Sequence, residues 1–232
     1  MPTIVFVSPK GGAGKTTAAL LLASQLARGA GVTVIDADPN HPIQSWASAS
    51  APANFTVISD ADEENIIERI EEAAGRSPFV VVDLEGTAAK IVLLAVSQAD
   101  FVIIPLQGSQ LDAEQASRAL RVIKQQEKMS GRAVPYAVLL TRTNPAIRTR
   151  TMAHIQRGLV AAGVPILEHE LHEREAFRAI FSFRKPLDQL DEGDVVNIAK
   201  AITNAERFTA EVIDKLRQIK EIRHGARGAI IP

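Results

Sequence analysis

The sequence of 232 residues contains no cysteine, and this absence excludes several classes of protein. Without thiols the chain forms no disulfide, no thiolate metal site and no cysteine nucleophile. Aromatic residues make up only 4%, with one tryptophan and one tyrosine, so base stacking on single-stranded nucleic acid is not expected. No apolar run approaches the roughly 20 residues of a membrane span, and Met1 leads directly into the first apolar run rather than into a signal peptide. We therefore expect a cytoplasmic protein with no membrane span.

The net charge is only −1, but the charged side chains are unevenly distributed. Residues 36–72 carry nine acidic side chains against one basic side chain. Residues 142–185 carry eight basic side chains against four acidic ones, and residues 215–227 carry five against one. An anionic partner would therefore meet the second half of the chain. Solvated helix faces are the alternative explanation of the same pattern.

Short apolar runs alternate along the chain with segments that have helical spacing. Runs such as Val80–Val82 and Val102–Ile104 are continuous rather than alternating, which is typical of strands covered on both faces. The alternation predicts an α/β fold: a doubly wound, mainly parallel sheet with helices on both faces, in a single domain spanning residues 1–232. The expected strands are residues 3–8, 32–36, 55–58, 79–83, 101–105, 136–141 and 165–167, and the clearest helical segments are residues 16–28, 62–74, 111–128 and 148–162.

The end of the chain is predicted to be a helical segment over residues 192–224, followed by a frayed tail over residues 225–232. Apolar residues recur there mostly three or four positions apart, which indicates one long helix or two helices separated by a kink near Thr203-Asn204. We expect this stripe to pack against the sheet. A helix lying on a membrane surface is the alternative.

The most informative segment is Pro9-Lys10-Gly11-Gly12-Ala13-Gly14-Lys15-Thr16-Thr17, between an apolar run and an alanine- and leucine-rich segment. A strand, a glycine-rich turn and a helix start in this order are the setting of a phosphate-binding loop. Glycines let successive N–H groups converge on phosphate oxygens, and the helix adds the positive end of its dipole. Lys15 can then reach the β- and γ-phosphates, and the Thr16 hydroxyl can bind Mg²⁺. The segment predicts a nucleoside triphosphate site with these nucleotide-binding residues: Gly11, Gly12, Ala13, Gly14, Lys15, Thr16 and Thr17.

Asp83 ends a run of four apolar residues, Phe79–Val82, in the usual form of a Walker B strand. An acid at such a strand tip can hold Mg²⁺ through a water molecule; the alternative is an aspartate that caps the next turn. Another strand ends in Asp36-Ala37-Asp38, and two acids separated by one residue point the same way if the strand continues. The alternative there is an aspartate-rich turn before a helix.

With Pro9 in place of the usual first glycine, the form Lys-Gly-Gly-x-Gly-Lys-Thr-Thr resembles the deviant P-loop of the ParA/MinD family. The resemblance implies an ATPase in which Lys10 reaches across a dimer interface to the partner's nucleotide. It also implies that Asp36 is a structural acid and that Asp38 lies in switch I, where it orients the attacking water and contacts the Mg²⁺ shell. The implied catalytic residues are Lys10, Lys15 and Asp38, and the implied metal site is formed by Thr16, Asp38 and Asp83.

The resemblance extends from residue 3 to about residue 200. In the segment 97–112 it places Pro105 beside the nucleotide and the dimer face. The segment Thr141–Pro145 would contact the base, and residues 84–87 would form switch II. Glu85 departs from the Pro-Pro-Gly that related proteins often carry in switch II. Asp38, Trp46 and the segment His172–Arg174 resemble small plasmid-partition proteins and VirC-type proteins.

The family implies a function that can be tested: the ATP-bound homodimer binds duplex DNA without sequence preference and releases it after slow hydrolysis. A ParB-like or centromere-binding protein would stimulate turnover, and the ATP-bound form would be nucleoid-associated. The alternatives are a MinD-like positioning ATPase on a membrane surface, an accessory ATPase of conjugative DNA transfer, and a metabolic P-loop ligase. The residues that we expect to contact DNA phosphates are Arg148, Arg150, Arg157, Arg178, Arg184, Lys185, Arg217, Lys220 and Arg223.

Overall fold

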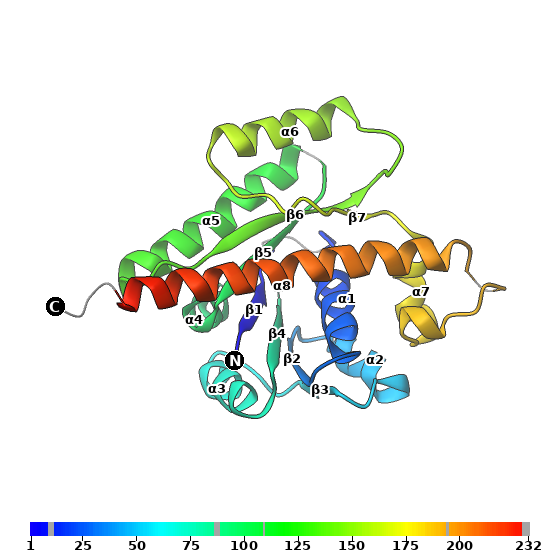
Figure 1. The fold of residues 1–232 in the computed structure, drawn as a ribbon, viewed down its shortest axis with the longest axis horizontal. Coiled ribbons are helices and arrows are strands. Elements are labelled where there is room, and N and C mark those ends of the chain that lie inside the picture. The colour runs from blue at the N-terminus through cyan, green and yellow to red at the C-terminus, as the bar shows by residue number, and fades with distance from the viewer. Residues whose placement is uncertain (9–11, 86–88, 109, 194, 229–232) are drawn as a thin grey trace.

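The computed structural model describes residues 1–8, 12–85, 89–108, 110–193 and 195–228. A sheet of seven parallel strands runs through the molecule in the order β3-β2-β4-β1-β5-β6-β7 (Figure 1). The strands are β1 (Thr3–Phe6), β2 (Val32–Ala37), β3 (Phe55–Ile58), β4 (Phe79–Leu84), β5 (Phe101–Leu106), β6 (Tyr136–Thr143) and β7 (Leu171–His172).

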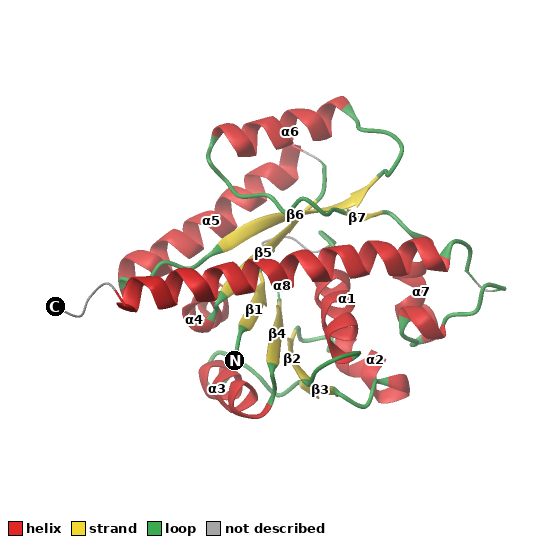
Figure 2. Ribbon diagram, in the orientation of Figure 1, coloured by secondary structure: helices red, strands yellow, loops and turns green. Residues whose placement is uncertain are grey.

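Helices cover both faces of this sheet (Figure 2). The helices are α1 (Lys15–Ala27), α2 (Pro42–Ser50), α3 (Ile66–Arg76), α4 (Ala89–Gln98), α5 (Gln110–Ser130), α6 (Arg150–Ala161), α7 (Glu175–Phe183) and α8 (Ile198–Gly228), with a short 3₁₀ turn at Leu187–Gln189. One core packs α1, α2, α7 and α8 on the sheet, and the other packs α3, α4, α5 and α6 on the opposite face. The predicted doubly wound α/β architecture is confirmed.

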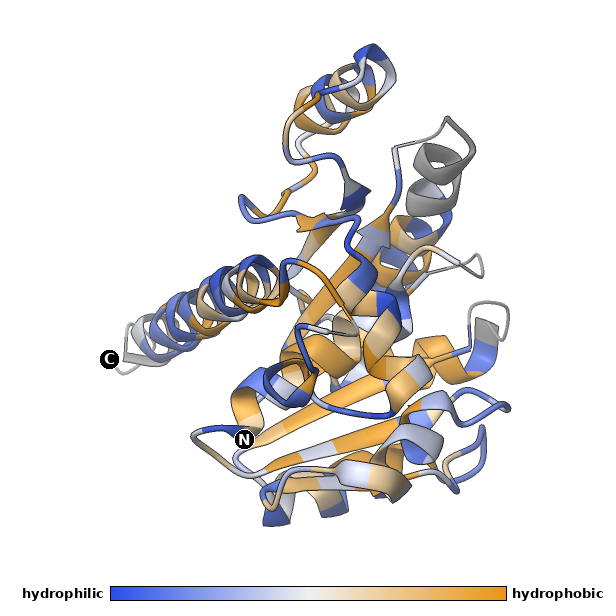
Figure 3. Ribbon diagram, turned by 90° about the vertical axis from the view of Figure 1, so that its right-hand side faces the viewer, coloured by the Kyte–Doolittle hydropathy of each residue, from blue (hydrophilic) through white to orange (hydrophobic). Residues whose placement is uncertain are grey.

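The strands are hydrophobic on both sides because both faces are covered. Ile4 and Phe6 of β1 point into one core, whereas Val5 points into the other, and all three are fully buried. Figure 3 shows the strands as a hydrophobic layer between the helices. The continuous apolar runs in the sequence follow from this burial.

The seventh strand lies later in the chain than predicted. Residues 165–167 make only an isolated bridge to β6, through Ile166 and Val138, and the edge strand forms instead at Leu171–His172. Between them the backbone N–H groups of Glu168 and His169 each donate to the Glu211 carboxylate of α8, at 2.8 Å. This side chain satisfies donors that a continuous strand would have given to its neighbour, so the expected strand is interrupted.

The C-terminal helix α8 is one unbroken helix from Ile198 to Gly228. It starts later than predicted because Asn197 has a left-handed φ of 61°. It also continues beyond residue 224 into the predicted tail, whose residues 229–232 lie outside the described part of the chain. Of the two predicted alternatives, one long helix is therefore confirmed; the Asn204 side chain bonds to the His172 N–H of β7 and to the Glu170 carbonyl oxygen. The apolar stripe of α8 packs on the sheet as expected, and no helix among the described residues is long and apolar enough to cross a membrane.

Candidate nucleotide site

The loop between β1 and α1 lies at the carboxyl ends of the central strands. Gly12 and Gly14 adopt φ values of 87° and 83°, a left-handed conformation that glycine adopts without strain. Gly14 is the N-cap of α1 and offers no side-chain cap, so the first N–H groups of the helix are left for an anion. Of the predicted nucleotide-binding residues, Lys10 and Gly11 lie outside the described part of the chain.

Two neighbouring strand ends hold this loop in place. Thr141, at the end of β6, donates its hydroxyl to the carbonyl oxygen of Ala13 at 2.8 Å, and both are buried. A Cβ on Gly14 would lie 3.5 Å from Thr141 Cβ. Just after β5, the Gln107 amide donates to the carbonyl oxygen of Gly12. These contacts seat the P-loop on β5 and β6.

Lys15 and Asp83 form a buried ion pair on the floor of the loop. Lys15 Nζ lies 2.5 Å from Asp83 Oδ1, and the two side chains are 9% and 0% exposed. Burial raises the pKa of Asp83, and the charge of Lys15 and hydrogen bonds from Lys15 and Thr16 oppose that rise. The charge of Asp38 raises the Asp83 pKa further. The structure therefore brings together four predicted site residues: Lys15, Thr16, Asp38 and Asp83.

Asp36 is a buried acid at the end of β2 that holds the start of α2. It sits opposite Asp83 in the β2–β4 pairing and is completely buried. Its Oδ2 accepts the N–H groups of Ile43 and Gln44 at 2.8 and 2.9 Å, so it caps α2 in place of the nominal N-cap residue, His41. Burial raises the pKa of Asp36, the hydrogen bond from Gln44 opposes the rise, and the charge of Asp83 adds to it.

Asp38 lies one residue beyond β2 and is only partly exposed. The strand does not continue to this acid, so the geometry assumed for Asp36 and Asp38 does not apply. Instead, Asp38 Oδ1 accepts the backbone N–H of Asn40 at 3.0 Å and its side-chain amide at 3.1 Å. This local turn holds Asp38 at the mouth of the site.

The donor set fits Mg²⁺ in combination with phosphate oxygens. Asp36 Oδ1 and Asp83 Oδ2 are buried and have no hydrogen-bond partner among the described residues. Mg²⁺ keeps several waters and binds one or two carboxylates together with substrate phosphates. In the described ranges no group of three or more His, Asp or Glu residues forms a metal cage. Thr16, Asp38 and Asp83 therefore fit a metal whose remaining ligands come from a nucleotide and water.

Pro105, residues 84–87 and the segment Thr141–Pro145 are also predicted to surround the nucleotide. Pro105 is a buried residue of β5, and the contact from this strand to the loop comes from Gln107. Of switch II, Gly86 and Thr87 lie outside the described residues. The segment Thr141–Pro145 is predicted to contact the base of the nucleotide. In the structure, the Thr141 side chain instead supports the P-loop through its hydrogen bond to Ala13.

A small cavity of about 40 Å³, too small for a nucleoside, lies next to the described part of the P-loop. Gly14 and Thr17 form one side of the cavity, and Arg142, His172 and Phe177 are among the residues on the other side. Asn144 and Pro145 lie beside a different and larger pocket. The end of β6 therefore borders the cavity beside the P-loop, whereas the β6–α6 loop that follows borders the larger pocket.

The predicted DNA-contacting residues do not form one patch on the chain. They lie on α6 (Arg150, Arg157), on or just after α7 (Arg178, Arg184, Lys185) and on the C-terminal half of α8 (Arg217, Lys220, Arg223), which are well separated in Figure 1.

Several of these cations are also neutralised by neighbouring carboxylates. Arg148 pairs with Glu170, Arg178 with Glu173, Arg217 with Asp214, and Arg223 with the partly buried Asp100. Such pairs leave less positive charge for a partner than the composition of the segments indicates.

Comparison with known proteins decides the family. Residues 1–222 match the VirC1 protein family. The chain belongs to the VirC1/ParA family. It is 40% identical over 220 residues to Protein ParA of Rhizobium radiobacter, covering 94% of this chain and 99% of that protein. It is 30% identical over 187 residues to Protein virC1 of Rhizobium rhizogenes, covering 78% and 80%.

A solved structure shows the same fold. The chain matches a putative plasmid partition protein from Borrelia burgdorferi bound to AMPPNP, with a TM-score of 0.70 and 18% identity. The match covers 92% of this chain and 99% of that one. The resemblance to ParA-type proteins is therefore confirmed by sequence and by fold.

The buried carboxylate of Asp36 generates a prediction about stability. Because its pKa is raised on folding, ionised Asp36 costs stability, and this cost appears as the pH rises through the folded-state pKa. Asp36→Asn keeps an acceptor for Ile43 and Gln44 and removes the charge. Asp36→Ala loses the cap and should lower the free energy of unfolding by about 1 kcal/mol.

Urea denaturation at about pH 4.5 and about pH 7.5 tests this. At each pH the free energy of unfolding of Asp36→Asn is compared with that of the unmodified protein. This difference should be more favourable to Asp36→Asn at the higher pH than at the lower pH. Equal loss of stability in Asp36→Asn and Asp36→Ala at the higher pH would contradict the assignment.

Proposed function

We propose that this chain is a ParA-like ATPase that binds Mg-ATP at its P-loop, closes into a homodimer around the nucleotide and holds duplex DNA without sequence preference. Hydrolysis is slow, releases the DNA and is stimulated by a ParB-like or centromere-binding partner. The observation that carries this proposal is the convergence of Lys15, Thr16, Asp38 and Asp83 at the uncapped start of α1.

The comparisons support the choice of ATP and of a DNA cargo. A relative of the same fold was solved with AMPPNP, and full-length similarity joins the chain to a protein named ParA. The ATP-bound form would then be nucleoid-associated, and its task would be plasmid or chromosome partition or the positioning of another cargo. The similarity to VirC1 supports an accessory role in conjugative DNA transfer as the second candidate.

The residues of the site divide the chemistry between them. Lys15 would exchange its contact with Asp83 for the β- and γ-phosphates, and the N–H groups of α1 would hold the same oxygens. Thr16, Asp38 and Asp83 would hold Mg²⁺, which when bound neutralises phosphate charge. Asp38 would orient the attacking water from the mouth of the site. Positioning and charge neutralisation supply most of the acceleration in phosphoryl transfer.

A need for an activating partner is consistent with the position of Asp38. Its carboxylate is engaged by Asn40 in a turn at the edge of the site rather than fixed on a strand. A partner protein that reshapes this turn would change how well the water is aligned. Slow hydrolysis without the partner is the expected consequence.

Asp38→Ala separates ATP binding from hydrolysis. The variant should still bind Mg-ATP, because Lys15, the loop and the other two Mg²⁺-holding residues, Thr16 and Asp83, are unchanged, but its turnover should fall by at least about 100-fold, as for the loss of a positioned catalytic group. Phosphate release under single-turnover conditions measures this, with Asp62→Ala, an exposed acid at the start of the α3 region, as the control. Unchanged turnover in Asp38→Ala would remove Asp38 from the mechanism.

Lys10 provides a test of the sandwiched dimer. Lys10→Ala and Lys10→Gln should bind ATP as monomers yet lose ATP-dependent dimerisation, because the lysine would neutralise the partner's nucleotide across the interface. Light scattering with Mg-ATP, in the Asp38→Ala background to block turnover, measures the change. Undiminished dimerisation would refute the assignment of Lys10.

DNA binding and membrane binding predict opposite results in one cosedimentation experiment. With Mg-ATP and Asp38→Ala, the protein should bind a DNA duplex and not anionic lipid vesicles, and its DNA affinity should fall steeply with salt because phosphate contacts release counterions. Binding to vesicles but not to DNA would favour a MinD-like positioning ATPase instead.

A further inference from the structure

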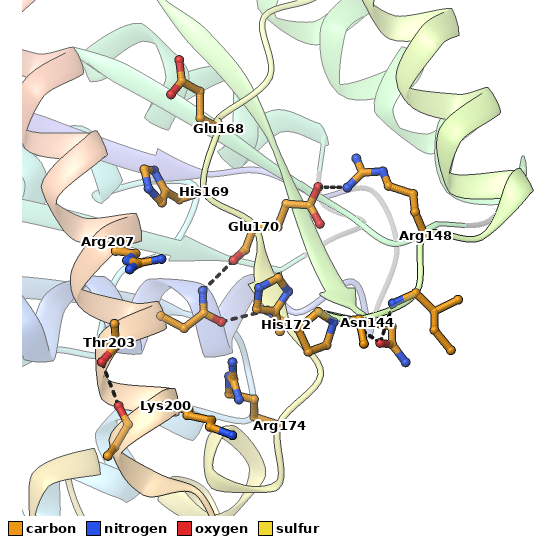
Figure 4. A pocket seen from close by; sticks show the side chains of 15 residues that line it. Asn144, Arg148, Glu168, His169, Glu170, His172, Arg174, Lys200, Thr203 and Arg207 are labelled. Carbon is orange, nitrogen blue, oxygen red and sulfur yellow. Dashed lines mark hydrogen bonds and ion pairs between the residues drawn. The ribbon is translucent and has the colours of Figure 1, made fainter.

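A second pocket, of about 570 Å³, lies between the β6–α6 loop, the segment 168–174 and the N-terminal half of α8 (Figure 4). None of the described P-loop residues lines it, although it shares His172 and Arg174 with the small cavity beside Gly14 and Thr17. Its volume is in the range of small-molecule sites, about 300–1,000 Å³. The polar side chains that line it include Arg148, His172, Arg174, Lys200, Asn204 and Arg207.

The pocket carries an excess of positive charge. Arg148 is neutralised by Glu170, at 2.6 Å, and the Glu211 carboxylate accepts the His169 backbone N–H and lies 3.0 Å from its ring. Among the described residues, no acid pairs with the other three cations of the pocket, which are Arg174, Lys200 and Arg207. Glu168 is the remaining acid of the lining, and Figure 4 shows it at the upper rim. Three unpaired cations thus face one unpaired carboxylate.

Arg174 is the cation best placed to bind a ligand. It is half-buried, and its Nε is buried without a hydrogen-bond partner among the described residues. Burial also lowers its pKa, as expected for a guanidinium that lacks a counter-ion. A planar guanidinium matches the geometry of phosphate oxygens and can donate two parallel hydrogen bonds.

The walls of the pocket are held in place before any ligand arrives. Asn204 of α8 is 8% exposed; its Oδ1 accepts the His172 N–H at 3.0 Å, and its Nδ2 donates to the Glu170 carbonyl at 2.7 Å. The His172 ring in turn bonds to the Thr143 hydroxyl at 2.8 Å. Helix α8, β7 and β6 are therefore joined around the pocket, and a preformed site binds with a smaller ordering cost.

We propose that this pocket is a second phosphate-binding site, separate from the P-loop, for a phosphate ester carried either by a DNA backbone or by a free nucleotide. Arg174, Lys200 and Arg207 supply its positive charge. If the ester belongs to DNA, the inference rests on the proposed function and places a DNA contact on the N-terminal half of α8. The cations that the sequence suggested on α8 lie instead on its C-terminal half.

The test compares two double charge reversals in the full chain. Lys200→Glu with Arg207→Glu alters the pocket, and Lys124→Glu with Lys128→Glu makes the same charge change on exposed positions of α5. The first arm measures retention of a fluorescein-labelled duplex with Mg²⁺ and a non-hydrolysable ATP analogue. If DNA is the source, the pocket variant should lose roughly tenfold or more in affinity, and the α5 variant should stay close to the unmodified protein.

The second arm counts nucleotides bound per chain by equilibrium dialysis with labelled ATP. If a free nucleotide is the source, the unmodified protein and the α5 variant should bind two nucleotides per chain and the pocket variant one. ATP-dependent dimerisation of the pocket variant shows that the P-loop still works, so a failure of the pocket can be told apart from a failure of the proposed function. The proposal is overturned if the pocket variant matches the α5 variant in both arms, whether both retain binding or both lose it.

Discussion

The contact between Lys15 and Asp83 is the interaction on which the nucleotide site depends. Two opposite charges are buried in contact at 2.5 Å, at the point where the carboxyl ends of β1 and β4 meet the start of α1. Removing either partner would leave a buried charge uncompensated, which is strongly destabilising. The pair therefore keeps Lys15 at the floor of the loop, from where it can transfer to phosphate oxygens.

Around this pair the protein holds more negative charge than it neutralises. Burial raises the pKa values of both Asp36 and Asp83, and each acid lies within the field of another carboxylate. Such an arrangement costs stability in the free protein and favours the binding of cations. A metal carried in with a triphosphate would relieve that cost. The same electrostatics would therefore favour a metal–nucleotide complex over a nucleotide without metal.

Much of the fold was predictable because local patterns determine it. Continuous apolar runs indicated covered strands, and the glycines before Lys15 indicated the P-loop. The errors have a common cause, which is contact between residues distant in sequence. Glu211 interrupts the expected strand at residues 165–167, and Thr141 supports the P-loop rather than the base. No spacing in the sequence points to such partners.

The residues of the site also differ in whether a local motif or a contact between distant segments determines them. Lys15, Thr16 and Asp83 could be proposed from their motifs, but the support from Thr141 and Gln107 could not, because these residues lie near the ends of two other strands that only the fold brings to the loop. The basic pocket was missed for a related reason: its lining comes from three segments that only the fold brings together. Counting charges along the chain shows that basic residues gather in its second half, but it does not show which of them lie together on the surface.

In the proposed mechanism a loop of backbone amides, with Lys15 released from Asp83, binds the triphosphate of ATP. The most direct test is isothermal titration calorimetry of ATP with Mg²⁺ into the unmodified protein and into Lys15→Gln, which preserves much of the side-chain length and removes the charge. We predict Mg²⁺-dependent binding to the unmodified protein and its loss in Lys15→Gln. Equal Mg²⁺-dependent binding to both proteins, or none to the unmodified one, would contradict the claim.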